Sequence, residues 1–206
     1  MMRNADIYPP LADRTSCETV KIGKVEKYRM TIHTFSDEQL AGQRLMVGFE
    51  GREFNEDLRE LIGRLYVGGL ILFSQNIAEP DQLQRLCRDC QDFAARCGQP
   101  PLVIAVDQEG GPVARMKAPH FTEFPGNPTM RDEDDARAFA QTTARELSAA
   151  GINMDMAPVM DVAPDDHSGI MADRVFGCRP DHVARMGTAL IETLQAGGVM
   201  AVAKHF

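Results

Sequence analysis

Residues 103–115 have the sequence VIAVDQEGGPVAR, in which an apolar run gives way abruptly to polar residues. A continuous apolar run of this kind is typical of a strand in a parallel sheet, which is buried on both faces. Asp107 follows the run at once, and Arg115 comes after a double glycine that lets the backbone turn sharply. The stretch therefore predicts a buried strand with a carboxylate and a guanidinium just beyond its carboxyl end.

Apolar strands of this type alternate with helices along most of the chain. We expect strands at residues 44–49, 68–73, 102–106, 152–160 and 199–203. We expect helices at residues 54–66, 80–98, 132–151 and 181–198, after a short helix opened by a capping box at Ser36 and Gln39. The alternation indicates an α/β fold with a parallel sheet. Two architectures remain open: a complete doubly wound sheet, or a (β/α)₈ TIM barrel truncated after about five strands, since a whole barrel needs about 250 residues.

Composition limits the class of protein. The chain has 206 residues and a net charge of −8, which argues against nucleic-acid binding because that needs a basic face. It has no apolar run of the roughly 20 residues that cross a membrane, and its start lacks the apolar core of a secretory signal. We therefore expect a cytoplasmic protein with a flexible tail at residues 1–35 and, at residues 36–206, one domain or most of a larger one. The oligomeric state is not predicted.

Ionisable residues gather where the predicted strands end. Asp107 follows the strand at 102–106, Asp161 follows the next, and Lys204 and His205 follow the last. Arg174 lies in the loop between the last two strands. Because parallel strands bring their carboxyl ends to one edge of the sheet, these side chains are expected to form a site there.

The chemistry of these residues favours a ligand with many hydroxyl groups. Asp107 can accept hydrogen bonds from neighbouring hydroxyls, while Arg115 and Arg174 are rigid donor forks. Lys204 adds a cation, and His205 adds a donor or an acceptor. A dinucleotide is a poorer fit because DQEGG is not a G-x-G-x-x-G sequence and begins with an acid. Taken singly, Asp107 has a second interpretation as a helix cap, and each arginine has one as a surface ion pair.

Two clusters resemble metal or redox sites, but simpler interpretations are favoured. Cys87 and Cys90 have the spacing of a C-x-x-C pair, yet they fall on one face of a predicted helix and are expected to be buried thiols. The second cluster, Asp161, Asp165, Asp166 and His167, is expected to supply turn acceptors. We therefore predict no metal site.

Five segments, taken in order, resemble the family-3 glycoside hydrolases. They are GGLILFSQNI, PLVIAVDQEGGPVARM, GINMDMAPVMDV, DRVFG and VAKHF. The likeness covers residues from about 36 to the last residue and is strongest to the NagZ-like β-N-acetylhexosaminidases. It departs from the family at Pro112, where an arginine is common.

The resemblance implies a fold, an activity and a set of sugar-binding residues. It implies a (β/α)₈ barrel that removes terminal β-linked N-acetylglucosamine with retention of configuration, from substrates such as the peptidoglycan fragments recycled by the cell, without a cofactor. Asp107 and Arg115 would bind the non-reducing end of the sugar, and Arg174, Lys204 and His205 would complete the pocket. In the family the nucleophile and the acid/base lie beyond the KHF segment, so no catalytic residue is expected within this chain, and the chain alone is expected to be insoluble or inactive.

Three other functions remain open. A family-3 β-glucosidase shares the aspartate and the KHF segment. A non-catalytic sugar-binding protein would bind without turnover. A lyase would use Lys204 as a Schiff-base nucleophile on a barrel strand.

Overall fold

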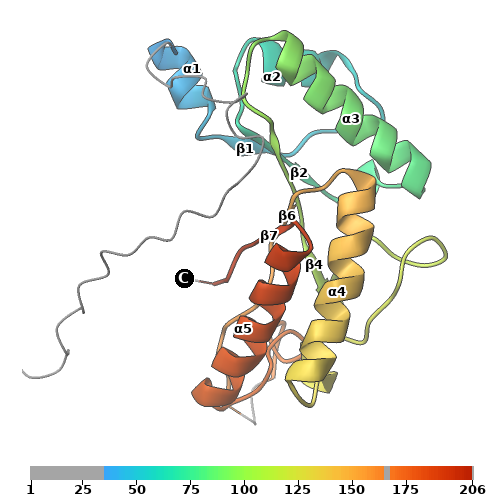
Figure 1. The fold of residues 1–206 in the computed structure, drawn as a ribbon, viewed down its shortest axis with the longest axis vertical. Helices are drawn as coiled ribbons and strands as arrows, with labels where there is room; N and C mark the ends of the chain where they lie inside the picture. The colour runs from blue at the N-terminus through green and yellow to red at the C-terminus, as the bar shows by residue number, and fades with distance from the viewer. Residues whose placement is uncertain (1–34, 165–167, 206) are drawn as a thin grey trace, which may run out of the picture. The chain divides into compact units, whose positions relative to one another are not determined.

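The computed structural model describes residues 35–164 and 168–205 (Figure 1). The elements in chain order are α1 (Asp37–Gly42), β1 (Met46–Val47), α2 (Glu56–Gly63), β2 (Gly69–Leu72), α3 (Pro80–Arg96), β3 (Val103–Val106), β4 (Gln108–Gly110), β5 (Val113–Ala114), α4 (Glu133–Ala150), β6 (Met154–Asp155), α5 (Pro180–Ala196) and β7 (Met200–Ala201). Short 3₁₀ turns follow β2 at Ser74–Asn76 and precede α4 at Asn127–Thr129. All five predicted strands and all five predicted helices are present.

The main sheet has five strands in the order β1-β2-β3-β6-β7, and every neighbouring pair is parallel. This confirms the α/β class and the parallel sheet. A doubly wound sheet reverses its strand order at one point. The order here follows the chain throughout the described residues, which argues against that alternative and is consistent with consecutive strands of a barrel.

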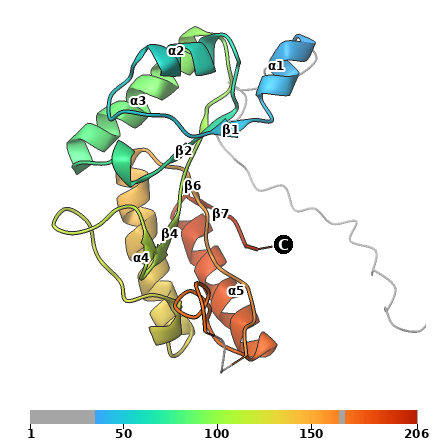
Figure 2. The same cartoon turned by 180° about the vertical axis from the view of Figure 1, so that it is seen from behind.

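Consecutive helices pack against one another, α2 on α3, α3 on α4 and α4 on α5 (Figure 2). Their apolar faces and the strands form one core that includes Leu58, Leu86, Ile104, Phe139 and Leu190. Burying side chains of this size contributes about 1.5–3 kcal/mol each, so the core fixes where the strand ends lie.

Helix ends follow the local signals in the sequence. The predicted capping box is present, because the Ser36 hydroxyl accepts from the Gln39 amide and the Gln39 side chain accepts from the Ser36 amide. In α4, Asp132 caps the first turn by accepting from the amides of Asp134 and Asp135. Gly151, with φ of 84°, ends the same helix in a left-handed conformation that suits glycine.

The sequence prediction differs from the structure mainly in the strands. The strand expected at 152–160 is a two-residue β6 followed by a separate parallel bridge between Val159 and Lys204. Pro158 lies in the gap and has no amide hydrogen to donate to a ladder. The antiparallel hairpin of β4 and β5 was not predicted, because strands of three and two residues are too short to show a strand pattern.

Some predictions lie outside the described residues. These are the tail at 1–35, apart from Phe35, and the loop residues 165–167. Among the helices of the described ranges, none is both long enough and apolar enough to cross a membrane.

Candidate functional site

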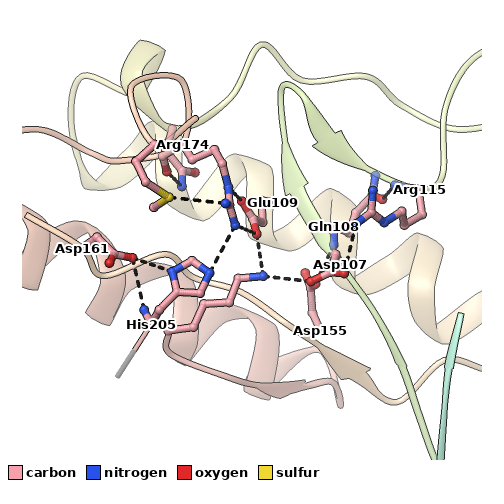
Figure 3. A network of polar contacts seen from close by, with 11 residues as sticks. Asp107, Gln108, Glu109, Arg115, Asp155, Asp161, Arg174 and His205 are labelled. Atoms are coloured by element: carbon pink, nitrogen blue, oxygen red, sulfur yellow. Dashed lines mark hydrogen bonds and ion pairs between the residues drawn. The ribbon is translucent and has the colours of Figure 1, made fainter. Parts of the chain in front are cut away.

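The candidate site lies beyond the carboxyl ends of β3, β6 and β7. Figure 3 shows its side chains and their polar contacts. Asp107 follows β3 directly, and Asp161 lies in the segment that comes after β6. Lys204 follows β7 and is held beside Val159 by the isolated bridge and by hydrogen bonds to the backbone of Pro158 and Met160. The parallel sheet thus brings residues almost 100 positions apart in sequence to one edge, as expected.

The β4–β5 hairpin brings Arg115 back to Asp107. Gly110 and Gly111, with φ of 83° and 59°, make its turn. Inside the hairpin the Gln108 side chain accepts from the amides of Arg115 and Met116 at 3.0 Å each, and donates to the Met116 carbonyl at 2.9 Å. The sharp turn expected at the double glycine is confirmed.

Asp107 is shared by two cations. Its Oδ2 accepts from Nη2 of Arg115 at 3.2 Å, and its Oδ1 accepts from Nζ of Lys204 at 2.9 Å. Burial alone would raise the pKa of Asp107, but the hydrogen bonds and the attraction of Lys204 and Arg115 outweigh it and hold the pKa below its usual value. Asp107 is therefore ionised and held in place from both sides.

Glu109 anchors the other half of the site. Its side chain is 1% exposed and forms a bidentate pair with Arg174, with Oε1–Nη2 and Oε2–Nε distances of 2.7 and 2.8 Å. Nζ of Lys204 lies 2.5 Å from the same Oε1. The Arg174 carbonyl also accepts from the Asn127 amide group at 2.7 Å, so both ends of this arginine are fixed.

His205 is oriented by two charged neighbours. Its Nδ1 lies 2.7 Å from Oδ2 of Asp161, which also accepts from the His205 amide at 3.1 Å. Its Nε2 lies 3.3 Å from Nη2 of Arg174. Because arginine only donates, this contact requires Nε2 to be the acceptor, so the hydrogen-bond network assigns the proton to Nδ1.

These contacts join the five residues that were predicted to bind the sugar into one network. The set is Asp107, Arg115, Arg174, Lys204 and His205. Reasoning from the sequence missed Glu109, which links two of these residues. The sequence does contain a signal for Glu109, which is its position two residues after Asp107. Side chains two positions apart in an extended segment point to the same side, so Glu109 is expected to face the same site as Asp107.

The cysteine pair behaves as the simpler interpretation predicted. Cys87 and Cys90 are buried on the inner face of α3, and burial raises the pKa of each thiol to about 12. Asp161, from the second cluster, binds His205. Residues 165–167 are not described, and the described part of the chain contains no group of three ligand residues that could hold a metal ion.

Most of the chain matches one protein family. Residues 24–206 match the family model described as the Glycosyl hydrolase family 3 N terminal domain. A β-hexosaminidase of Alkalilimnicola ehrlichii is 37% identical over 171 residues, which are 79% of this chain and 47% of that protein. A second β-hexosaminidase, from Idiomarina loihiensis, is 35% identical over 170 residues, 79% of this chain and 49% of that protein. The chain spans about half the length of these curated relatives.

Solved structures agree with the sequence relatives. A family-3 β-N-acetylglucosaminidase from a Paenibacillus species matches with a TM-score of 0.80 at 38% identity, over 84% of this chain and 33% of that one. NagZ from Neisseria gonorrhoeae, solved in complex with N-trifluoroacetyl-D-glucosamine, matches with a TM-score of 0.71 at 30% identity, over 79% and 49% of the two chains. The chain therefore belongs to glycosyl hydrolase family 3 and resembles its NagZ-like β-N-acetylhexosaminidases.

Proposed function

We propose that residues 36–206 form the sugar-holding part of a retaining β-N-acetylhexosaminidase that removes terminal β-linked N-acetylglucosamine from glycosides such as peptidoglycan fragments. The names of the relatives support an N-acetylhexosamine glycoside as the substrate, and so does the glucosamine derivative bound by one solved neighbour. The order of the parallel strands supports a (β/α)₈ barrel as the complete fold. In this proposal hydrolysis uses a nucleophile and an acid/base group and needs no cofactor.

The single observation that carries the proposal is the network of five predicted residues at one edge of the sheet. Ion pairs hold Asp107, Arg174 and Lys204 in fixed positions before any ligand arrives. Such fixed donors and acceptors match the directional hydroxyl groups of a pyranose, and little ordering is needed on binding. In this proposal Asp107 and Arg115 bind the non-reducing end, and Arg174, Lys204 and His205 bind the rest of the ring.

We assign sugar binding, and not bond cleavage, to the described residues. A retaining glycosidase needs a nucleophile and a group that can donate and accept a proton. Asp107, Glu109 and Asp161 are each held by a cation or by His205, and Asp155 is fully buried. We therefore expect the 206-residue chain to bind N-acetylglucosamine without releasing nitrophenol from a nitrophenyl N-acetyl-β-glucosaminide.

The lyase alternative is not supported by the position of Lys204. Its ammonium group contacts two carboxylates, Asp107 at 2.9 Å and Glu109 at 2.5 Å. Both contacts engage Nζ as an ion-pair partner, so it is not available to attack a carbonyl carbon, as Schiff-base formation requires.

We also propose a cytoplasmic location for the protein. Cys87, Cys90 and Cys97 are free thiols, as expected in a reducing compartment.

A binding experiment tests the proposal. Nuclear magnetic resonance titration of the chain with N-acetylglucosamine should give saturable binding, weaker for glucose. Asp107→Asn should lower the affinity at least about tenfold, because it removes a charged hydrogen-bond acceptor. Asp92→Asn, at an exposed position on α3, is the matched control and should bind normally. Equal binding of glucose would favour the β-glucosidase alternative, and binding of neither sugar would refute the proposal.

A further inference from the structure

Asp155, on β6, is a fully buried acid directly beside the candidate site. It is 0% exposed and lies in register with Val106 of β3 and Ala201 of β7. Its Oδ1 accepts from the Gln108 amide at 3.0 Å. Its Oδ2 is also buried, and within the described part of the chain it has no hydrogen-bond partner. An ionised carboxylate oxygen in this position is costly, because burial removes water and no donor replaces it.

The charges around Asp155 also disfavour its ionised form. Burial raises the pKa of Asp155 to about 8. The Gln108 amide and Lys204 lower the pKa, while the carboxylates of Asp107 and Glu109 raise it, and burial outweighs the lowering contributions. Lys204 already contacts both of those carboxylates, at 2.9 and 2.5 Å. Asp155 therefore carries its proton at neutral pH.

The Asp155 hydrogen bond supports the part of the chain that presents Asp107. The Gln108 amide belongs to the peptide group that joins Asp107 to Gln108. The Gln108 side chain in turn holds the backbone of Arg115, whose guanidinium contacts Asp107 (Figure 3). The position of the Asp107 carboxylate thus depends on Asp155 through both the adjoining peptide and the hairpin.

We propose that Asp155 is a positioning residue whose uncharged form holds Asp107 and Lys204 in the arrangement that binds sugar, and whose ionisation in alkaline solution abolishes that binding. The inference rests on the proposed sugar-binding function. Ionised Asp155 places a third carboxylate near the Lys204 ammonium, which then has three competing partners in a buried space. The Lys204 ammonium then moves away from Asp107 toward Asp155. Asp107 thereby loses one of the two cations that orient it.

The pH dependence of sugar affinity tests this proposal. N-acetylglucosamine is titrated into the wild-type chain, Asp155→Asn and the exposed control Asp92→Asn between about pH 6 and about pH 9.5. If only the form with neutral Asp155 binds, wild-type affinity falls about tenfold between about pH 7 and about pH 9. The amide introduced by Asp155→Asn keeps an acceptor for the Gln108 amide and cannot ionise. This variant is therefore expected to match the wild type at neutral pH and to keep that affinity in alkaline solution, whereas the control follows the wild type.

Each outcome decides one point. An alkaline loss of affinity that persists in Asp155→Asn would overturn the proposal, because another group would be responsible. Loss of binding by Asp155→Asn at neutral pH, with the fold intact by circular dichroism, would overturn it too. If the wild type binds no sugar at any pH, the proposed function fails and this inference fails with it, whereas wild-type binding without a pH-dependent loss refutes only the inference.

Discussion

Glu109 is the residue on which the site depends most for its internal order. One carboxylate, 1% exposed, holds both Arg174 and Lys204. Neither cation is well solvated, since their side chains are 14% and 15% exposed. A buried ion pair contributes little net stability when intact, but removal of one partner leaves the other charge buried and uncompensated.

Glu109→Gln should therefore destabilise the chain strongly. We expect the free energy of unfolding, measured by urea denaturation at neutral pH, to fall by about 3 kcal/mol. Glu53→Gln removes the same charge at an exposed position and should change stability by less than about 0.5 kcal/mol. A loss below about 1 kcal/mol for Glu109→Gln would show that Glu109 does not anchor the two cations.

Asp155 makes stability depend on pH in a predictable direction. Its pKa is raised from the ordinary value of 3.8 to about 8 in the folded chain, chiefly by burial. Between these values the folded state holds a proton that the unfolded state has lost, so the free energy of unfolding falls as pH rises through this window. The full stability is present below the lower value, and the loss is complete above about pH 8.

Asp155→Asn should remove this loss. The variant is expected to gain stability relative to the wild type by up to about 1.4 kcal/mol per pH unit between about pH 5 and about pH 7. Chemical denaturation at several pH values measures the difference, in which contributions from unchanged groups cancel. A constant difference across that range would mean that Asp155 titrates normally.

Among single residues, the sequence was sufficient to identify site residues that directly follow a strand. It was insufficient to identify residues whose role is to hold other site residues in place. Asp107, Lys204 and His205 were identifiable because parallel strands share an edge. Glu109 and Asp155 do not come directly after a predicted apolar strand, and their importance lies in burial and in their partners. Burial depends on contacts between segments far apart in sequence, which a local pattern does not specify.

Among the helices and strands, the start of β2 depends on Gly68, and Gly98 provides a glycine in open space for comparison. Gly68 precedes β2, and its amide donates to the carbonyls of Gly42 and Leu45. A Cβ at this position would overlap the Gln43 carbonyl oxygen, which is backbone and has little freedom to move. Gly98 has φ of 72°, but a Cβ there would meet nothing within 4 Å.

Gly68→Ala should therefore cost more than Gly98→Ala. We expect a loss of at least about 3 kcal/mol in unfolding free energy for Gly68→Ala, since backbone must shift. Gly98→Ala, which suffers only from its left-handed conformation, should lose about 1–2 kcal/mol. Thermal denaturation of the two variants compares them directly. Similar losses would indicate that the start of β2 adjusts easily.

The elements themselves were largely predictable, and their ends were less so. Helices have strong periodic signals and clear caps, such as Ser36 and Asp132. Strand length depends on pairing with neighbours, so the expected strand at 152–160 becomes a short β6 and a separate bridge around Pro158. The β4–β5 hairpin was missed because strands of three and two residues are too short to show an alternation of apolar and polar residues.

At the scale of the whole molecule, the described residues form a parallel sheet whose polar edge is assembled from segments far apart in sequence. The strand order places Asp107 after β3 and Lys204 after β7, on either side of β6, and an ion pair connects their side chains across that edge. The fold class and the family were predictable, because both depend on an ordered set of segments. The closed (β/α)₈ barrel belongs to the proposal, which the order of the parallel strands supports.

A crystal structure of the chain with N-acetylglucosamine, soaked at about ten times its measured dissociation constant, would show whether one sugar ring reaches the proposed binding residues together. We predict one pyranose ring within hydrogen-bond distance of the side chains of Asp107, Arg174 and Lys204 together. A sugar bound elsewhere, or a ring that contacts Asp107 while the two cations face away from it, would contradict the account.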